Sequence, residues 1–209
     1  MDIDFSQLTE YQRYKLMASL IVPRPIALVT TLGPDGTVNA APFSMFNMVG
    51  EEPPIVMISL NRRDDASLKD TALNIVRTGE FVVHMADEAI AAQMHRCGEH
   101  HPPHVSELDV VGFTALPSKV VAPPRIAEAP VAFECTLFET METASRQVFI
   151  GQVRWMHARD EQGLFTLFPG SRRPATAGQS RRVTLRVLKH AQGTQRRVAR
   201  RGRPSRRVG

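Results

Sequence analysis

The stretch that decides the fold is PRPIALVTT at residues 23–31, followed by the turn GPDG at 33–36 and by NAAPFSMFN at 39–47. Residues 26–31 form a short apolar, β-branched run, which is typical of a buried strand, and Gly-Pro-Asp-Gly is a strong turn signal. The return strand begins near residue 37. The pattern therefore predicts a β-hairpin.

The second half of this hairpin is unusual for a strand because it combines small residues with a proline. Ala40 and Ala41 permit close approach to the backbone, and we expect Pro42 to interrupt the hydrogen-bonded ladder. Ser44 and Asn47 then leave polar groups facing a cavity. A hairpin that ends in this way can hold a flat ligand against main-chain amides.

The composition is that of a globular protein with one ordinary domain. The chain has 209 residues, of which 43% are hydrophobic, and this length suffices to bury a core. No apolar run reaches the length of a membrane span, and the acidic start of the chain is unlike a signal peptide. Cys97 and Cys135 form no CxxC pair and are expected to be free thiols. We therefore expect a cytoplasmic protein.

The net charge of +5 hides a division of the chain into two parts. All 21 acidic residues lie at or before Glu161, whereas residues 171–209 hold 13 of the 26 basic residues and no acidic one. Residues 1–170 therefore carry 13 basic and 21 acidic residues, a formal charge of −8. This predicts a domain over residues 1–168 and a basic, disordered or atypical tail over residues 169–209.

Short strands dominate the rest of the pattern, with few helices. Ser6 is expected to cap a first helix and Ser67 to open another one, which buries Leu68, Ala72, Ile75 and Val76 and ends at Gly79. A closed β-barrel with helical insertions accounts for this mainly β pattern. The expected strands cover residues 55–60, 81–85, 112–116, 131–140 and 147–158.

Several of these pieces, in this order and spacing, resemble the flavin reductase-like family of the FMN-binding split barrel. They are PRPIALVTT, NAAPFSMFN, EEPP at 51–54, KDTALN at 69–74, GEFVV at 79–83, PPRIAE at 123–128 and VAFEC at 131–135. The family includes flavoredoxins and reductase components of two-component monooxygenases. The resemblance extends from about Tyr14 to about Phe165.

The resemblance implies a mainly β, Greek-key split barrel that binds FMN and acts as an NAD(P)H-dependent flavin reductase or a flavoredoxin-like electron carrier. It also implies a homodimer that works with small-molecule substrates and with a monooxygenase or redox partner. Flavin chemistry needs an open ring face and correct geometry, so no residue is assigned as a catalyst. The sequence has no GxGxxG, so the nicotinamide would stack directly on the flavin.

The residues assigned to cofactor binding fall into two groups, one along the hairpin and one around the phosphate. Arg62, Arg63 and Lys69 cluster beside an expected helix N-terminus, which favours an anion. A solvated basic turn is the alternative for these cations, as an edge strand ending in a bulge is for the hairpin. The full set is Thr30, Asn39, Ala40, Ala41, Pro42, Phe43, Ser44, Asn47, Ser59, Arg62, Lys69, Thr71 and Asn74.

The His-rich loop allows two interpretations. His95, Cys97, His100 and His104 could surround zinc or iron, but their spacing matches no metal motif, and a loop lining the flavin pocket is the preferred interpretation, without a metal.

The basic tail departs from the family pattern. It replaces the family's C-terminal flavin contacts, as a frameshift in a GC-rich gene would. Its RGRP at 201–204 matches the core of an AT-hook, so a nucleic-acid-associated protein is the alternative function; a non-enzymatic flavin-binding protein is another. Because the tail lacks aromatic residues for base stacking, we expect only weak, sequence-independent binding to DNA and do not expect nucleic acid to be the functional partner.

Overall fold

A computed structural model describes residues 2–102 and 104–158 of the chain. The basic tail and the domain boundary expected at residue 168 lie outside these residues and stay predictions. Within the described part, no helix is both long and apolar enough to cross a bilayer. The elements are η1 Phe5–Gln7, α1 Glu10–Leu20, β1 Ala27–Leu32, β2 Val38–Phe43, β3 Phe46–Glu51, β4 Pro54–Asn61, α2 Asp70–Thr78, β5 Glu80–Met85, η2 Glu88–Ile90, α3 Ala91–Arg96, α4 Glu107–Val111, β6 Ala115–Leu116, β7 Arg125–Ile126, β8 Val131–Glu142 and β9 Arg146–Ala158.

The predicted hairpin is confirmed as β1 and β2. The side chain of Asp35 accepts a hydrogen bond from the amide of Thr37 (3.0 Å), and Gly36 has φ +84°, so the turn uses the residues that the sequence indicated. Pro42 does not interrupt the pairing, contrary to expectation, because it pairs with Leu28 and the ladder continues to Phe43. The strand tolerates proline because β2 is an edge of its sheet, where an amide can be missing.

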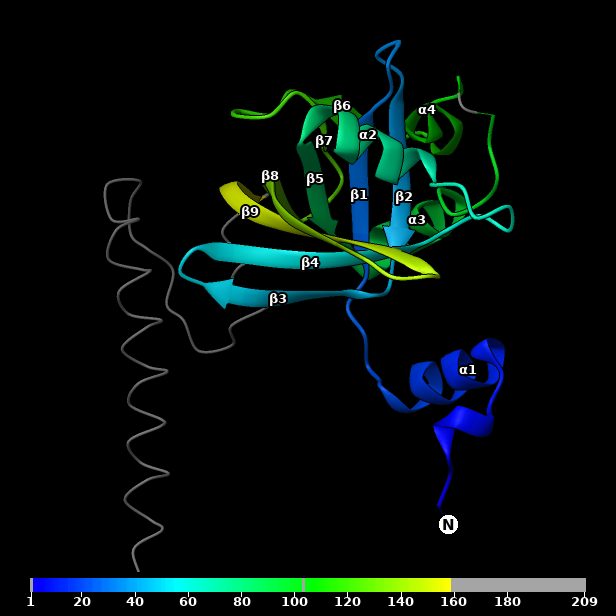
Figure 1. The fold of residues 1–209 in the computed structure, drawn as a ribbon. Coiled ribbons are helices and arrows are strands. Elements are labelled where there is room, and N and C mark those ends of the chain that lie inside the picture. The colour runs from blue at the N-terminus through cyan, green and yellow to red at the C-terminus, as the bar shows by residue number, and fades with distance from the viewer. Residues whose placement is uncertain (1, 103, 159–209) are drawn as a thin grey trace, which may run out of the picture. The chain divides into compact units, whose positions relative to one another are not determined.

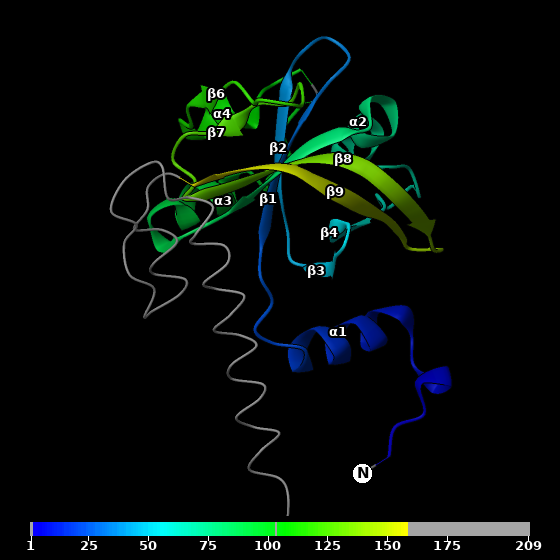
Figure 2. The ribbon, with the colours of Figure 1, turned by 90° about the vertical axis from the view of Figure 1, so that its left-hand side faces the viewer.

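Seven strands form one antiparallel sheet in the order β2-β1-β5-β8-β9-β4-β3. In Figure 1, β1, β2 and β5 stand upright while β3 and β4 run across them, and Figure 2 shows β8 and β9 curving between the two sets. Register shifts in the β8–β9 pair accompany this curvature. The two edge strands are joined by the short connection at residues 44–45, and Ser59 N donates to Met45 O (2.8 Å). The expectation of a mainly β barrel with helical insertions is confirmed.

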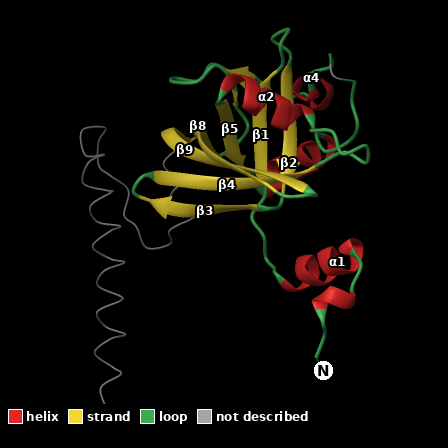
Figure 3. Ribbon diagram, viewed as in Figure 1, coloured by secondary structure: helices red, strands yellow, loops and turns green. Residues whose placement is uncertain are grey.

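The interior of the curved sheet is a hydrophobic cluster that includes Phe81, Phe149, Ile58 and Leu60. Gly151 is required there, because a methyl group at its Cα would lie 2.3 Å from Cζ of Phe81. A second cluster lies between the other face of β1 and β2 and the segment that includes α3 and α4. Figure 3 shows α2 and α4 beside these two strands.

The helices begin later than the sequence suggested. Thr9, not Ser6, caps α1, because Gln12 three residues on completes a capping box. Lys69, not Ser67, precedes α2, and no side chain caps that helix. Gly79 ends α2 as expected, with φ +69°.

This later start changes the buried face of α2. Ala72 and Ile75 are buried as expected, but Val76 is 58% exposed. Thr71 and Asn74 are buried instead, so the inner face of α2 is partly polar. Their polar atoms therefore need partners in the sheet.

Candidate functional site

The outer edge of β2 presents the small residues that the sequence singled out. Ala41 and Pro42 are half-buried, and Pro42 has no amide to donate. The amide of Ala40 donates to Oε2 of Glu107 (2.9 Å), so one expected ligand donor already has a partner within the protein. The hydroxyl of Ser44 binds no described residue. Gly98 lies against the ring of Pro42, and Ala41 packs against the main hydrophobic cluster, so the least covered part of this edge is at Ser44.

Ser59 lies next to this edge, because its amide reaches the carbonyl of Met45. Asn47 is exposed, and its Oδ1 accepts from the amide of Met48 (2.9 Å). Phe43 is buried in the main hydrophobic cluster. The predicted hairpin residues thus divide into an open part around Ser44 and Ser59 and a core part at Phe43.

The N-terminus of α2 is the second part of the site. The first-turn amides of a helix have no partners within the helix, and here no side chain caps them. The carbonyl of Lys69 accepts the first intrahelical bond, from Leu73 N (3.0 Å). An uncapped helix start of this kind favours an anionic ligand.

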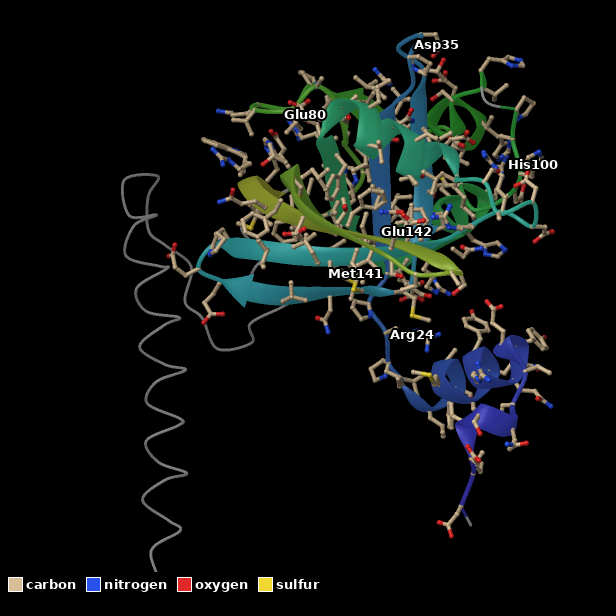
Figure 4. The ribbon with its side chains drawn as sticks, viewed as in Figure 1. Arg24, Asp35, Glu80, His100, Met141 and Glu142 are labelled. Atoms are coloured by element: carbon tan, nitrogen blue, oxygen red, sulfur yellow. The ribbon has the colours of Figure 1, made fainter. Side chains whose placement is uncertain are left out.

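Three cations lie near this helix start, and they differ in their partners. Arg62 forms an ion pair with Glu142, which Figure 4 labels at the end of β8. Arg63 forms an ion pair with Asp70 (2.8 Å). Lys69 forms no ion pair with any described residue. Lys69 is therefore the cation that is available to a ligand without breaking an existing pair.

The remaining predicted site residues lie inward and bind one another or other parts of the protein. Asn39 Nδ2 donates to Thr71 Oγ1 (2.9 Å), although 32 residues separate them. In the same way Asn74 Nδ2 donates to Thr31 Oγ1 (3.1 Å). These pairs hold α2 against the β1–β2 hairpin.

Thr30 lies apart from this arrangement. Its side chain is fully buried, and its hydroxyl donates to Pro124 O (2.6 Å). A direct role of Thr30 in cofactor binding stays a prediction without a contact that supports it.

A cavity of about 450 Å³ adjoins the site beside Asn39 and α2. Glu107 lines it, and burial chiefly raises the pKa of this carboxyl, although the hydrogen bond from Ala40 N opposes the shift. Nearby, burial first and then Glu107 raise the pKa of the Cys97 thiol to about 12, so this buried cysteine is unreactive. The described residues hold no group of three His, Cys, Asp or Glu placed to bind a metal.

Sequence reasoning did not anticipate a polar centre on the opposite side of the sheet. The carboxylate of Glu134 accepts from the amides of Lys119 and Val120 (2.7 Å each) and pairs with His157 Nε2 (2.5 Å). Burial would raise the pKa of Glu134, but these hydrogen bonds outweigh it and the pKa is lowered. A glutamate at a position expected to be buried in a strand was the signal that could have indicated it.

His84 belongs to the same region and is fully buried. Its Nε2 accepts from Ile126 N (2.9 Å), so its Nδ1–H donates to Leu28 O (2.9 Å), and the ring is neutral. Burial lowers its pKa to about 4. His84 and Glu134 thus fasten the segment at residues 117–126 to the sheet.

Comparison with known proteins agrees with this architecture. The family model described as "Flavin reductase like domain" matches residues 17–176. The chain belongs to the flavin reductase-like family. Its fold is the split β-barrel, as the resemblance predicted.

Three relatives illustrate the match. An uncharacterized protein of Aquifex aeolicus is 46% identical over 147 residues, covering 70% of this chain and 75% of that protein. The structure of 2-nitrobenzoate 2-nitroreductase from Pseudomonas fluorescens is 41% identical with a TM-score of 0.69, covering 76% of this chain and 77% of that one. Nitrilotriacetate monooxygenase component B from Bacillus cereus is 34% identical with a TM-score of 0.72, covering 76% and 81%.

Proposed function

We propose that the protein is an FMN-binding oxidoreductase that takes hydride from NADH or NADPH and passes electrons to a small acceptor or a partner protein. The observation that carries this proposal is the uncapped N-terminus of α2 beside Lys69. A phosphate there would meet free amides, the helix dipole and a cation without a competing ion pair. The donor set thus fits the phosphate of FMN.

The ring of FMN would lie at the end of β2, beside Ser44. Ala41 and Pro42 allow a flat group to approach the backbone closely, and the hydroxyls of Ser44 and Ser59 can donate to its polar edge. Bound FMN supplies the hydride and electron chemistry. The role of the chain is to orient the ring, keep one face accessible and exclude water from the other.

The acceptor and the assembly are part of the same proposal. One structural neighbour is a nitroreductase and another is a monooxygenase component, which supports either a small-molecule acceptor or a partner oxygenase. A homodimer with one flavin per subunit follows from the family resemblance. Of the assigned residues, we retain Ala41, Pro42, Ser44, Ser59, Arg62 and Lys69 for direct contacts.

The visible absorption spectrum of the protein purified without added flavin, followed by titration with FMN, tests the proposal. A flavin band that is bleached by NADH or NADPH supports it, whereas no binding of FMN at any concentration overturns it. Ala41→Leu provides the local test, because the larger side chain obstructs the ring. In this variant, titration with FMN should no longer change the flavin fluorescence, while the circular dichroism spectrum stays unaltered.

Ala122→Leu is the matched control, since Ala122 is exposed in the segment at residues 117–126, where its amide donates to Glu80 of β5. It should bind FMN as the unmodified protein does. Normal folding together with normal binding in Ala41→Leu would place the ring elsewhere.

A further inference from the structure

The cavity beside the proposed flavin site has its own set of polar groups. It lies between the β1–β2 turn, α2 and residues 101–102 and 105–107, and its volume of about 450 Å³ suits a small organic molecule. Figure 4 shows Asp35 at the tip of this turn. Pro34, Leu73, Pro102 and Val105 provide apolar walls. It extends along α2 away from Lys69, as far as Arg77.

The amide side chains in this cavity present acceptors. Asn39 and Asn74 use Nδ2 to bind Thr71 and Thr31, and no described residue donates to Oδ1 of either one. Asn74 is only 5% exposed, and it meets solvent where it lines the cavity. A ligand carrying N–H groups would replace water at these acceptors.

Two carboxylates add to this acceptor set. Asp70 and Glu107 both line the cavity, and Asp70 contributes to raising the pKa of Glu107 after burial, the larger cause. Glu107 accepts from the amide of Ala40, and Asp70 accepts from the guanidinium of Arg63. Each carboxylate retains lone pairs for further donors. A cation beside the partly buried carboxylate of Glu107 would stabilise its charged form.

The donors that line the cavity are fewer. Arg77 directs Nη2 to the carbonyl of Leu32, and Nε2 of His101 lies 3.4 Å from Arg96 O. The hydroxyl of Thr37 is a third donor on the lining, whereas the acceptors are two amide oxygens and two carboxylates, of which Asp70 is already paired with Arg63. A ligand that is itself an anion or an acceptor would therefore be disfavoured.

We propose that this cavity is a second small-molecule site that binds a planar cation with several N–H donors, such as an aromatic amidinium or guanidinium. The flat ring would pack against Leu73 and the two prolines, and the N–H groups would face Asn74 and Glu107. The proposal does not depend on flavin binding, because none of the residues retained above for contacts with FMN lines this cavity.

Isothermal titration of the protein with benzamidine, and with benzoate as the control of equal shape and opposite charge, tests the charge preference. We expect saturable binding of benzamidine and binding of benzoate at least about tenfold weaker. Glu107→Gln keeps a carbonyl acceptor for Ala40 and removes the charge, so benzamidine affinity should fall about tenfold, which is about 1.4 kcal/mol. Equal affinity for the two compounds would overturn the proposal.

Leu73→Trp locates the site, because Leu73 is 49% exposed and lines the cavity, which indole would fill. Val76→Trp is the matched control on the same helix, since Val76 is 58% exposed and does not line the cavity. Benzamidine binding should be lost in the first variant and retained in the second, while both titrate with FMN normally. Equal benzamidine binding in both variants would refute the site, and loss of FMN binding in Leu73→Trp would show that this cavity belongs to the flavin site.

Discussion

Two regions of this barrel differ in whether side chains accept hydrogen bonds from their backbone amides. In the segment at residues 117–126, carboxylates and an imidazole accept from the amides of Lys119, Val120, Ala122 and Ile126. At the N-terminus of α2 no side chain accepts from the first-turn amides. Figure 4 labels Glu80, whose carboxylate accepts from the amide of Ala122. We call the segment at residues 117–126, with its saturated amides, the closed region.

The difference shows where the fold is fastened and where it can accept a ligand. Amides that are saturated by buried acids rigidify a loop, and each acid is costly to remove. Amides left without a partner cost stability until an anion arrives. A binding site made of unpaired amides therefore needs neighbouring loops with saturated amides to hold its geometry.

The largest expected effect comes from breaking the closed region at Glu134. Glu134→Ala leaves two amides and His157 without their acceptor in a buried position. We expect the free energy of unfolding to fall by about 3–5 kcal/mol, measured by chemical denaturation. Glu139→Ala, at an exposed position of β8, is the control and should change stability by less than about 0.5 kcal/mol. Similar losses of unfolding free energy in both variants would show that Glu134 does not stabilise the segment at residues 117–126.

A second test uses pH and His84. Its pKa is about 4 in the folded protein against 6.5 when exposed, so the unfolded chain binds the proton more strongly. The contribution of His84 to stability is therefore complete above pH 6.5 and is lost as the pH falls from 6.5 towards 4, by about 3 kcal/mol at most.

Denaturation series across this pH range measure the loss. His95→Asn, at an exposed position, should keep the slope, whereas His84→Asn should flatten it. Because the pKa of Glu134 is lowered, protonation of this carboxyl in the folded protein reduces stability mainly at a lower pH than the range in which His84 titrates. A stability that stays constant from pH 6.5 to pH 4 would contradict a buried neutral imidazole.

The open region is tested by Lys69→Ala. Removing this ammonium should weaken FMN binding by about 1–3 kcal/mol, the range for a charge-assisted hydrogen bond, with little change in stability. Fluorescence titration with FMN measures it, and Lys15→Ala on α1 serves as the control. Unchanged affinity in Lys69→Ala would mean that the phosphate lies elsewhere.

The smallest effect is expected from Glu142→Gln. Its side chain is 67% exposed, and pairs of this kind contribute about 0–1 kcal/mol. The change should leave stability nearly unaltered while releasing Arg62 towards a bound phosphate. A loss of more than about 2 kcal/mol in chemical denaturation would show that this surface pair belongs with the closed region instead.

The sequence predicted those parts of the fold that depend on local signals. The β1–β2 hairpin, the end of α2 at Gly79 and strands β4, β5, β8 and β9 follow from turn residues, from the left-handed conformation that glycine allows and from β-branched runs. β3 was not predicted, and the strand expected at 112–116 is present only as Ala115–Leu116, because Gly112 instead ends α4. The start of α2 was wrong because Ser67 also has the pattern of a capping box, and local patterns do not show which of two starts the tertiary packing selects.

The candidate site was predicted less completely, for a related reason. The residue types around Ser44 and Lys69 indicated a ligand, but the pairing of Asn39 with Thr71 joins residues far apart in sequence, and only the folded chain reveals it. In the same way, nothing local marks Glu107 as the partner of Ala40 or Glu134 as the partner of Lys119. Whether a polar side chain serves a ligand or another part of the protein is decided by these long-range contacts.

The bond from Ala40 to Glu107 has one more consequence, for solubility. β2 ends the sheet, and an exposed edge can recruit a strand from another molecule and start aggregation. Along this edge Ala40 has already donated its amide and Pro42 has none, so an incoming strand finds no donors at two alternate positions. Glu107 and Pro42 thus protect the chain against edge-to-edge association along β2, a strand that α3 and α4 also cover in part.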